Sequence, residues 1–301
     1  MFDTTLFRQN FEPHKLLVGE PMSRHTTFCI GGPAAVMLLP DCAEDIVTAV
    51  ELAGFVGAPI FVTGGGSNLL VSDSGINAVV IKLGRDFARA ECEDGIITAQ
   101  AGLSLAALAD TALAQELAGL EFSAGIPGSL GGAVFMNAGA YGEEMSGVVQ
   151  SVQLLERGEL VTRGADGLGF GYRTSGVLTG GGIVLSATLR LEPGRPEDIL
   201  AKMEDLAAQR RDKQPLEYPS AGSAFKRPPG RFAGKLVDDA GLRGFAVGGA
   251  QISVKHAGFI INTGGATAQD VRALIAHVQE RVFKLFGVEL EPEVRMVGGG
   301  V

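Results

Sequence analysis

The chain has 301 residues, of which 46% are hydrophobic and 20% charged, and its formal net charge is −9. This length predicts about two domains, and the composition is typical of a well-packed globular protein. The negative charge argues against a broad surface for nucleic acid or anionic membranes, although it leaves room for a local basic pocket.

The cysteines and histidines form no ligand pattern. The three cysteines (Cys29, Cys42 and Cys92) include no CxxC pair, and the four histidines are scattered. We therefore expect reduced thiols and no metal site. The first residues lack a basic stretch followed by an apolar one, and no run approaches 18 apolar residues, so we expect a cytoplasmic protein without a membrane segment.

The first third of the chain predicts a strand–helix–strand unit that ends in a glycine loop. Strands are expected at 36–39 and 60–62, and Asp41 is expected to cap the helix between them, with Glu44 three residues later. The loop at 63–71 lacks the third glycine of a dinucleotide fingerprint and the lysine of a P-loop. By itself, it is as consistent with an ordinary turn as with a ligand-binding loop.

A second glycine-rich run, at 125–142, follows a helix that Ser104 caps and that is expected to stop at Gly119. The run is too rich in glycine for an ordinary helix or strand. Its backbone N–H groups, with Ser129 and Asn137, favour a cradle for a phosphate or a flat heterocycle. The alternative is a linker on the surface, although the apolar residues in the run fit a linker poorly.

The second half of the chain predicts an α+β arrangement. Strands are expected at 148–155 and 183–191, and a helix at 196–214 whose charged end, 209–213, is expected to be solvated. A loop at 218–230 carries small hydroxyl residues and two adjacent cations, and is either an ordinary surface loop or an anion-binding one. Helices at 232–240 and from Thr267 to Gly287, strands at 251–254 and 259–261, and a terminal strand at 288–297 follow.

Eight separated motifs resemble, in order, those of the UDP-N-acetylenolpyruvoylglucosamine reductase family. They are Thr27-Phe28-x-Ile30-Gly31-Gly32, Gly66-Ser67-Asn68-Leu69-Leu70, the run at 125–142, residues 170–173, Ser220-Ala221-Gly222-Ser223-x-Phe225-Lys226, and residues 249–251, 256–259 and 291–295. The short segment after Arg173 resembles the subtype without an inserted lid. Gly65 and Cys29 depart from the residues that are usual in the family.

The resemblance implies an α+β fold, with a two-subdomain FAD-binding module of the vanillyl-alcohol-oxidase (PCMH-like) type and a C-terminal α+β substrate domain. The implied domains are 1–80, joined by a terminal strand within 289–301, then 81–205 for the second FAD subdomain and 206–288 for the substrate. A monomer is the expectation, and the oligomeric state stays open.

The implied activity is that of an NADPH-dependent enzyme with non-covalent FAD. Such an enzyme reduces the enolpyruvyl group of UDP-N-acetylglucosamine enolpyruvate and makes UDP-N-acetylmuramate for peptidoglycan precursors. The cofactor carries the electron chemistry, so the protein must stabilise the negative charge that develops beside the substrate carboxylate and protonate that carbon.

By resemblance, Ser223 is the proton donor, and Arg173 and Glu293 stabilise the charge. Tyr172 and Lys226 are expected to bind the substrate. The residues expected to line FAD are Gly64, Gly65, Gly66, Ser67, Asn68 and Leu69 in the first loop, and Gly125, Ile126, Pro127, Gly128, Ser129, Gly131, Gly132, Asn137, Ala138, Gly139 and Ala140 in the second. An ionised Glu293 would repel an enolate, so it helps only if it is protonated or polarises a donor.

Without the family match, each site residue has a simpler explanation. Arg173, Glu293 and Lys226 could be ordinary surface charges, and Ser223 could be a turn residue. Two other functions also stay open at this point. One is an oxidase of the same flavin fold with tethered FAD, and the other is a non-catalytic protein that binds a sugar nucleotide.

Overall fold

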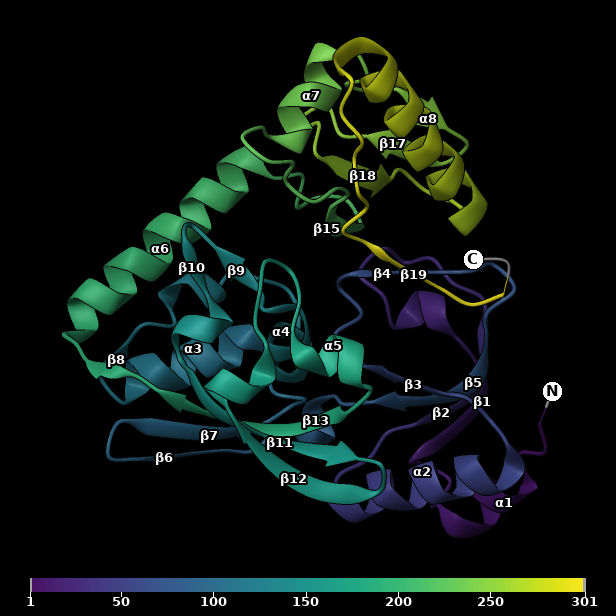
Figure 1. Cartoon of the computed structure of the whole chain (residues 1–301), viewed down its shortest axis with the longest axis vertical. Helices are drawn as coiled ribbons and strands as arrows, with labels where there is room; N and C mark the ends of the chain where they lie inside the picture. Colours follow the sequence, from purple (N-terminus) through teal and green to yellow (C-terminus); the bar gives the residue numbers. More distant parts are fainter. Residues whose placement is uncertain (1, 300–301) are drawn as a thin grey trace. The chain divides into compact units, whose positions relative to one another are not determined.

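The computed structural model describes residues 2–299, which divide into two compact units (Figure 1). The first unit comprises residues 2–18, 36–65 and 78–210, and the second comprises 19–35, 66–77 and 211–299. Each unit has its own buried apolar core. Residue 1 of the expected first domain and residues 300–301 of the expected terminal segment lie outside the described residues.

The first unit is built around a five-stranded antiparallel sheet of order β12-β11-β13-β7-β6. The strands are β6 (Ala90–Glu93), β7 (Ile96–Gln100), β11 (Val149–Glu156), β12 (Glu159–Gly164) and β13 (Ile183–Arg190). Alternating apolar residues of β7, β11 and β13 pack inward, as the sequence predicts for 148–155 and 183–191, with Ile97, Val152 and Leu189 fully buried. Helices α3 (Leu105–Ala114) and α4 (Leu130–Met136) lie over one face of the sheet (Figure 1).

The other elements of the first unit lie outside the five-stranded sheet. Strand β3 (Ile60–Thr63) pairs parallel with β5 (Ile76–Lys82) at one side of a sheet of order β1-β2-β5-β3. The remaining elements are α1 (Thr5–Asn10), β1 (Leu16–Pro21), β2 (Pro33–Leu38), α2 (Ala43–Val56), β8 (Leu117–Ala118), β9 (Gly139–Ala140), β10 (Glu143–Glu144), α5 (Gly176–Gly180), β14 (Glu192–Pro193) and α6 (Pro196–Lys213). The division between the units falls within β1, β2, β5 and α6.

The prediction that the glycine-rich run excludes a helix is wrong. Helix α4 lies within it, capped at its start by the hydroxyl of Ser129 and ended by Asn137 in the left-handed conformation. A Cβ on Gly131 would stand only 2.8 Å from the Cβ of Ala101. Glycine is therefore used here for close packing of the helix against residue 101, and this packing offsets its low helix propensity.

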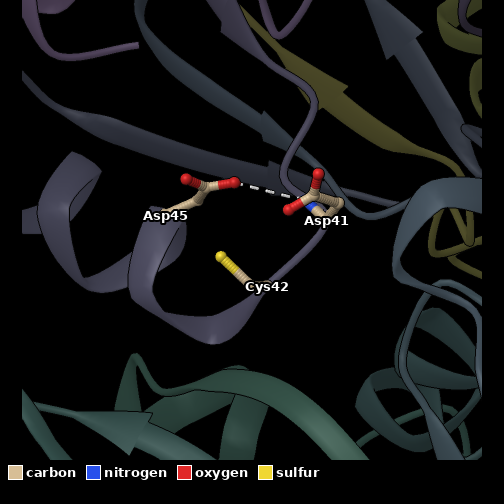
Figure 2. A group of neighbouring side chains, drawn as sticks. All are labelled: Asp41, Cys42 and Asp45. Atoms are coloured by element: carbon tan, nitrogen blue, oxygen red, sulfur yellow. Dashed lines mark hydrogen bonds between the residues drawn. The ribbon is translucent and has the colours of Figure 1, made fainter. Parts of the chain in front are cut away.

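The predicted cap of α2 is also wrong. The N-cap is Cys42, and its side chain makes no capping hydrogen bond. Asp41 lies one residue earlier, and its carboxylate binds the Lys15 ammonium at 2.8 Å. Figure 2 shows Asp41, Cys42 and Asp45 at this corner, where Asp45 accepts the backbone N–H of Asp41 at 3.3 Å. An ion pair with a distant residue has replaced the local cap.

The second unit is an α+β layer. Its four-stranded antiparallel sheet has the order β15-β18-β17-β16, and α8 packs on β16 and β17. Its elements are β4 (Leu69–Val71), β15 (Ser220–Ser223), α7 (Ala233–Asp239), β16 (Ala246–Val247), β17 (Ala250–Ile252), β18 (Phe259–Asn262), α8 (Ala268–Phe286) and β19 (Arg295–Val297). Helix α8 has the predicted ends: Thr267 and Asp270 form a capping box, and Gly287 is left-handed.

The C-terminal segment is a strand over a shorter range than predicted. Strand β19 covers only Arg295–Val297 and pairs parallel with β4, at Leu69–Val71. Before it, the chain pairs with a different segment: Glu293 N–H donates to Ala224 O at 2.9 Å, and Lys226 N–H donates to Glu291 O at 2.8 Å. Pro292 lies opposite Phe225 in this antiparallel bridge, at a position that makes no backbone hydrogen bond to the partner segment, so its missing N–H is tolerated. The regular strand begins after it.

Among the helices of residues 2–299, none combines the length and apolar character that a membrane span requires.

Candidate functional site

The two glycine-rich loops meet within the first unit. A Cβ on Gly64 would lie 1.9 Å from the Oγ of Ser129, and a Cβ on Gly65 would lie 3.2 Å from the Cα of Gly128. Gly64 therefore lies too close to Ser129 to carry any side chain, and Gly65 leaves little room for one. The two loops, which the sequence predicts to bind the same cofactor, therefore lie side by side at these residues.

Backbone hydrogen bonds attach the second loop to residues 101–105. Leu105 N–H donates to Gly128 O at 3.1 Å, and Gly131 N–H donates to Ala101 O at 2.8 Å. These bonds attach the run to the start of α3, a helix that the hydroxyl of Ser104 caps. The cradle is thus a fixed backbone surface rather than a free loop.

The far end of the run binds the segment that carries the predicted arginine. Asn137 is fully buried, and its amide donates to Gly171 O at 3.1 Å. The Arg173 guanidinium donates to Gly139 O at 3.0 Å and lies over the Tyr172 ring, 5.3 Å from the ring centre. These contacts place Tyr172 and Arg173 beside the predicted cofactor loop.

Helix α6 adds a residue that the sequence did not single out. The Arg210 guanidinium donates to the carbonyl of Gly125, the first residue of the run, and its Nε is buried without a partner. Burial lowers the pKa of this guanidinium. The prediction of a solvated end at 209–213 is therefore wrong for Arg210. The sequence signal was the charge cluster, but it could not distinguish Arg210 from its neighbours.

Ser223 and Glu293 lie together in the second unit. Ser223 is the last residue of β15, is exposed, and follows Gly222, which has a φ of +78°. The next residue, Ala224, accepts the N–H of Glu293 at 2.9 Å. The Lys226 ammonium is 2.5 Å from the carboxylate of Glu291 on the same pair of segments. The predicted proton donor, acid and phosphate ligand thus share one short stretch of backbone pairing.

The remaining part of the first glycine loop belongs to the same unit. Gly66 has a φ of +63°, and a Cβ there would lie 2.0 Å from the carbonyl oxygen of His25. The Asn68 amide donates to Glu293 O at 3.1 Å, and Asn68 O accepts the N–H of Arg295 at 3.0 Å. Residues 66–69 are therefore bonded directly to the segment that carries Glu293.

The predicted site residues thus fall into two groups. The first unit holds Gly64, Gly65, residues 125–140, Tyr172 and Arg173, and the second holds residues 66–69, Ser223, Lys226 and Glu293. Each group is brought together from separate parts of the sequence. Within its unit, each group is held in place by backbone hydrogen bonds.

One group of potential metal ligands occurs among residues 2–299, at Asp41, Cys42 and Asp45 (Figure 2). The Lys15 ammonium already binds both carboxylates at 2.8 Å, so a cation would have to displace it. Burial raises the pKa of the Cys42 thiol, which disfavours the thiolate that a metal needs. These features make the group a structural ion pair.

Comparison with known proteins now assigns the family. The family model described as UDP-N-acetylenolpyruvoylglucosamine reductase, C-terminal domain, matches residues 214–297, and that described as FAD binding domain matches residues 33–165. The UDP-N-acetylenolpyruvoylglucosamine reductase of Agathobacter rectalis is 52% identical over 296 residues, and that of Caldanaerobacter subterraneus is 50% identical over 285, each covering 94% of both chains. The chain belongs to the UDP-N-acetylenolpyruvoylglucosamine reductase family.

A solved structure agrees with this assignment. The crystal structure of UDP-N-acetylenolpyruvylglucosamine reductase (MurB) from Thermus caldophilus matches with a TM-score of 0.81 and 38% identity, covering 94% of this chain and 98% of that one. The predicted α+β class with an FAD-binding module is confirmed.

This reductase is an FAD-dependent oxidoreductase with NADPH as the reductant. It reduces the enolpyruvyl group of UDP-N-acetylglucosamine enolpyruvate in peptidoglycan precursor synthesis, which is the activity of a UDP-N-acetylmuramate dehydrogenase. Its residues fit the cofactor, because the Gly64–Ser129 and Gly65–Gly128 approaches leave only backbone and small side chains along the joined loops.

Proposed function

We propose that Ser223, Arg173 and Glu293 carry the proton and charge chemistry of this reduction. Bound FAD, once reduced by NADPH, would supply the hydride that adds to the terminal vinyl carbon of the substrate. The electron pair of the double bond then lies on the carbon beside the carboxylate. The Ser223 hydroxyl donates its proton to that carbon, which completes the lactyl ether.

Arg173 has the charge and shape to hold the substrate carboxylate. A guanidinium offers two parallel N–H donors to a carboxylate, and this pairing strengthens as negative charge spreads onto it. The proposal is supported by the bond from Arg173 to Gly139 O, which ties the arginine to the cofactor loop. Tyr172, beneath the guanidinium, contacts the substrate on the same side.

The observation that carries the proposal is the pairing of Glu293 N–H with Ala224 O. It fixes the backbone of Glu293 beside the residue that follows Ser223, so the acid and the hydroxyl are held in one local frame. Glu293 acts in its protonated form, or by polarising a donor, because an ionised carboxylate would oppose the developing charge. Lys226 binds the substrate phosphates, for which it exchanges its ion pair with Glu291.

We also propose that residues 64–69 and the named residues of 125–140 line FAD, which is bound without a covalent link. The proposal is supported by the contact of Gly64 with Ser129 and by the bonds that fix Gly128 and Gly131. Denaturation in acid should release all of the flavin from the chain. Flavin that stays with the chain would contradict the proposed mode of binding.

The wider setting is proposed as well. We expect a cytoplasmic monomer whose partners are NADPH and the sugar nucleotide, without nucleic acid or membrane. The net charge of −9 supports the last point, because it disfavours a surface for nucleic acid or anionic membranes. The domain division at 1–80 with 289–301, 81–205 and 206–288 stays a prediction. Sedimentation at several concentrations tests the monomer, and limited proteolysis tests the boundaries.

A single-turnover experiment on Ser223→Ala tests the role of Ser223. NADPH should bleach the bound flavin anaerobically at the wild-type rate, but the enolpyruvyl substrate should reoxidise it at least about 100-fold more slowly, as for loss of a general acid. Ser220→Ala, in the same strand, is the matched control and should reoxidise normally. Normal reoxidation in Ser223→Ala would place the proton donor elsewhere.

A further inference from the structure

Asn68 is bonded on both sides to the segment that carries Glu293. Its side-chain amide donates to Glu293 O at 3.1 Å, and its backbone oxygen accepts the N–H of Arg295 at 3.0 Å. The parallel ladder between β4 and β19 continues from this point, with Leu69 opposite Arg295. The side chain of Asn68 therefore extends a backbone ladder by one hydrogen bond, as far as Glu293.

The backbone of Glu293 is thereby held from two directions. Its N–H is bound to Ala224 O, next to Ser223, and its carbonyl is bound to Asn68, in the glycine loop. Asn68 is half-buried, so its bond with Glu293 is only partly open to competing water. An amide NH₂ is needed for the second bond, because a carboxylate or an aliphatic side chain at position 68 could not donate to a carbonyl.

We infer that Asn68 is a positioning residue for Glu293 and couples the glycine loop at residues 66–69 to the site of proton transfer. This inference rests on the role of Glu293 in the proposed function. In this role, the side-chain amide of Asn68 binds the protein's own segment around Glu293. A small displacement of Glu293 should slow the step that uses it, because catalytic groups act only over a narrow range of geometry.

The chain offers a matched control for this bond. The Gln279 side-chain amide donates to Leu290 O at 2.8 Å, on the same C-terminal segment and three residues before Glu293. Asn68→Asp and Gln279→Glu each replace the donating NH₂ by an oxygen with almost no change in shape. Asn68→Ala and Gln279→Ala remove the donor without adding charge, and they serve if an added carboxylate prevents folding.

Four quantities are measured on each variant: FAD affinity of the apoprotein by fluorescence, thermal midpoint, flavin reduction by NADPH, and flavin reoxidation by the enolpyruvyl substrate. Both half-reactions are measured on FAD-saturated protein, because Asn68 also belongs to the proposed FAD loop. We expect reoxidation to slow about tenfold or more in both Asn68 variants, beyond any change in flavin reduction by NADPH. The Gln279 variants should change reoxidation by less than about twofold. A role confined to flavin binding would instead reduce FAD affinity and both half-reactions together, and this result would overturn the inference.

A double-mutant cycle separates this inference from the proposed function. If Asn68 acts through Glu293, then Asn68→Ala should slow reoxidation no further in a Glu293→Ala background. Additive slowing in the double variant would overturn the positioning role while leaving Glu293 catalytic. Wild-type reoxidation in Glu293→Ala alone would instead contradict the proposed role of Glu293, and with it the inference.

Discussion

Replacing Gly66 by alanine should damage the protein far more than the same change at Gly265. Both glycines have left-handed backbones, with φ of +63° and +68°. A Cβ on Gly66 would lie 2.0 Å from the carbonyl oxygen of His25 and 3.0 Å from the Cα of Thr26, whereas Gly265 has nothing within 4 Å. The pair therefore isolates the cost of close approach from the cost of the backbone conformation.

The magnitude follows from these distances. Each alanine substitution lowers the free energy of unfolding by about 1–2 kcal/mol, because an L-residue is strained in the left-handed region. At Gly66 the distance between the new Cβ and the carbonyl oxygen of His25 must also increase, from 2.0 Å toward the 3.4 Å at which ordinary contact begins. That movement removes the hydrogen bond from Thr27 N–H to Gly66 O, worth about 1 kcal/mol, and displaces a packed loop at about 1–3 kcal/mol. Gly66→Ala should thus cost about 3–6 kcal/mol, against about 1–2 for Gly265→Ala.

Urea unfolding of the two FAD-free variants measures the difference, since both positions belong to the second unit. FAD titration should show weaker binding in Gly66→Ala and unchanged binding in Gly265→Ala. Equal losses of unfolding free energy in the two variants, with equal FAD affinity, would refute the reasoning. The loop would then relax without cost, and the approach to His25 would not be the reason for glycine at this position.

Arg210→Ala should weaken FAD binding about tenfold, because Gly125 loses the guanidinium that holds it, whereas Arg211→Ala, at an exposed neighbour, should leave binding unchanged in the same titration. Asp73→Ala should cost about 1–3 kcal/mol in urea unfolding, because that carboxylate accepts two backbone N–H groups at the start of α8, at 2.8 Å and 3.1 Å. Hydrogen bonds from the backbone and side chain of Thr267 hold the pKa of the Asp270 carboxyl below its ordinary value of 3.8. Its contribution to stability is therefore present above about pH 4 and lost as the pH falls through the native pKa, so Asp270→Asn should flatten that part of a stability–pH curve measured by urea unfolding.

The sequence predicted the features whose two partners are close in the chain. Thr267 and Gly287 bound α8 as expected, because the capping box and the left-handed glycine involve only neighbouring residues. Ser104 caps α3 for the same reason. The motifs also predicted the family and the cofactor, and the comparisons confirm both. The roles of the individual site residues stay predictions, because kinetic measurements on variants are needed to test them.

The tertiary structure decided the features whose partners are far apart. Helix α4 forms in the glycine-rich run because Gly131 packs against Ala101, and no propensity scale contains that contact. Lys15 takes the carboxylate of Asp41 that the local pattern assigned to a helix cap. Arg210 and Gly125 are 85 residues apart.

Asn68 and Glu293, 225 residues apart, give the clearest case. The sequence alone determined that a glycine loop and an acidic segment exist, since composition and turn chemistry are local properties. It could not determine that one amide joins them, because a hydrogen bond forms only where the fold brings its donor and acceptor within reach and in line.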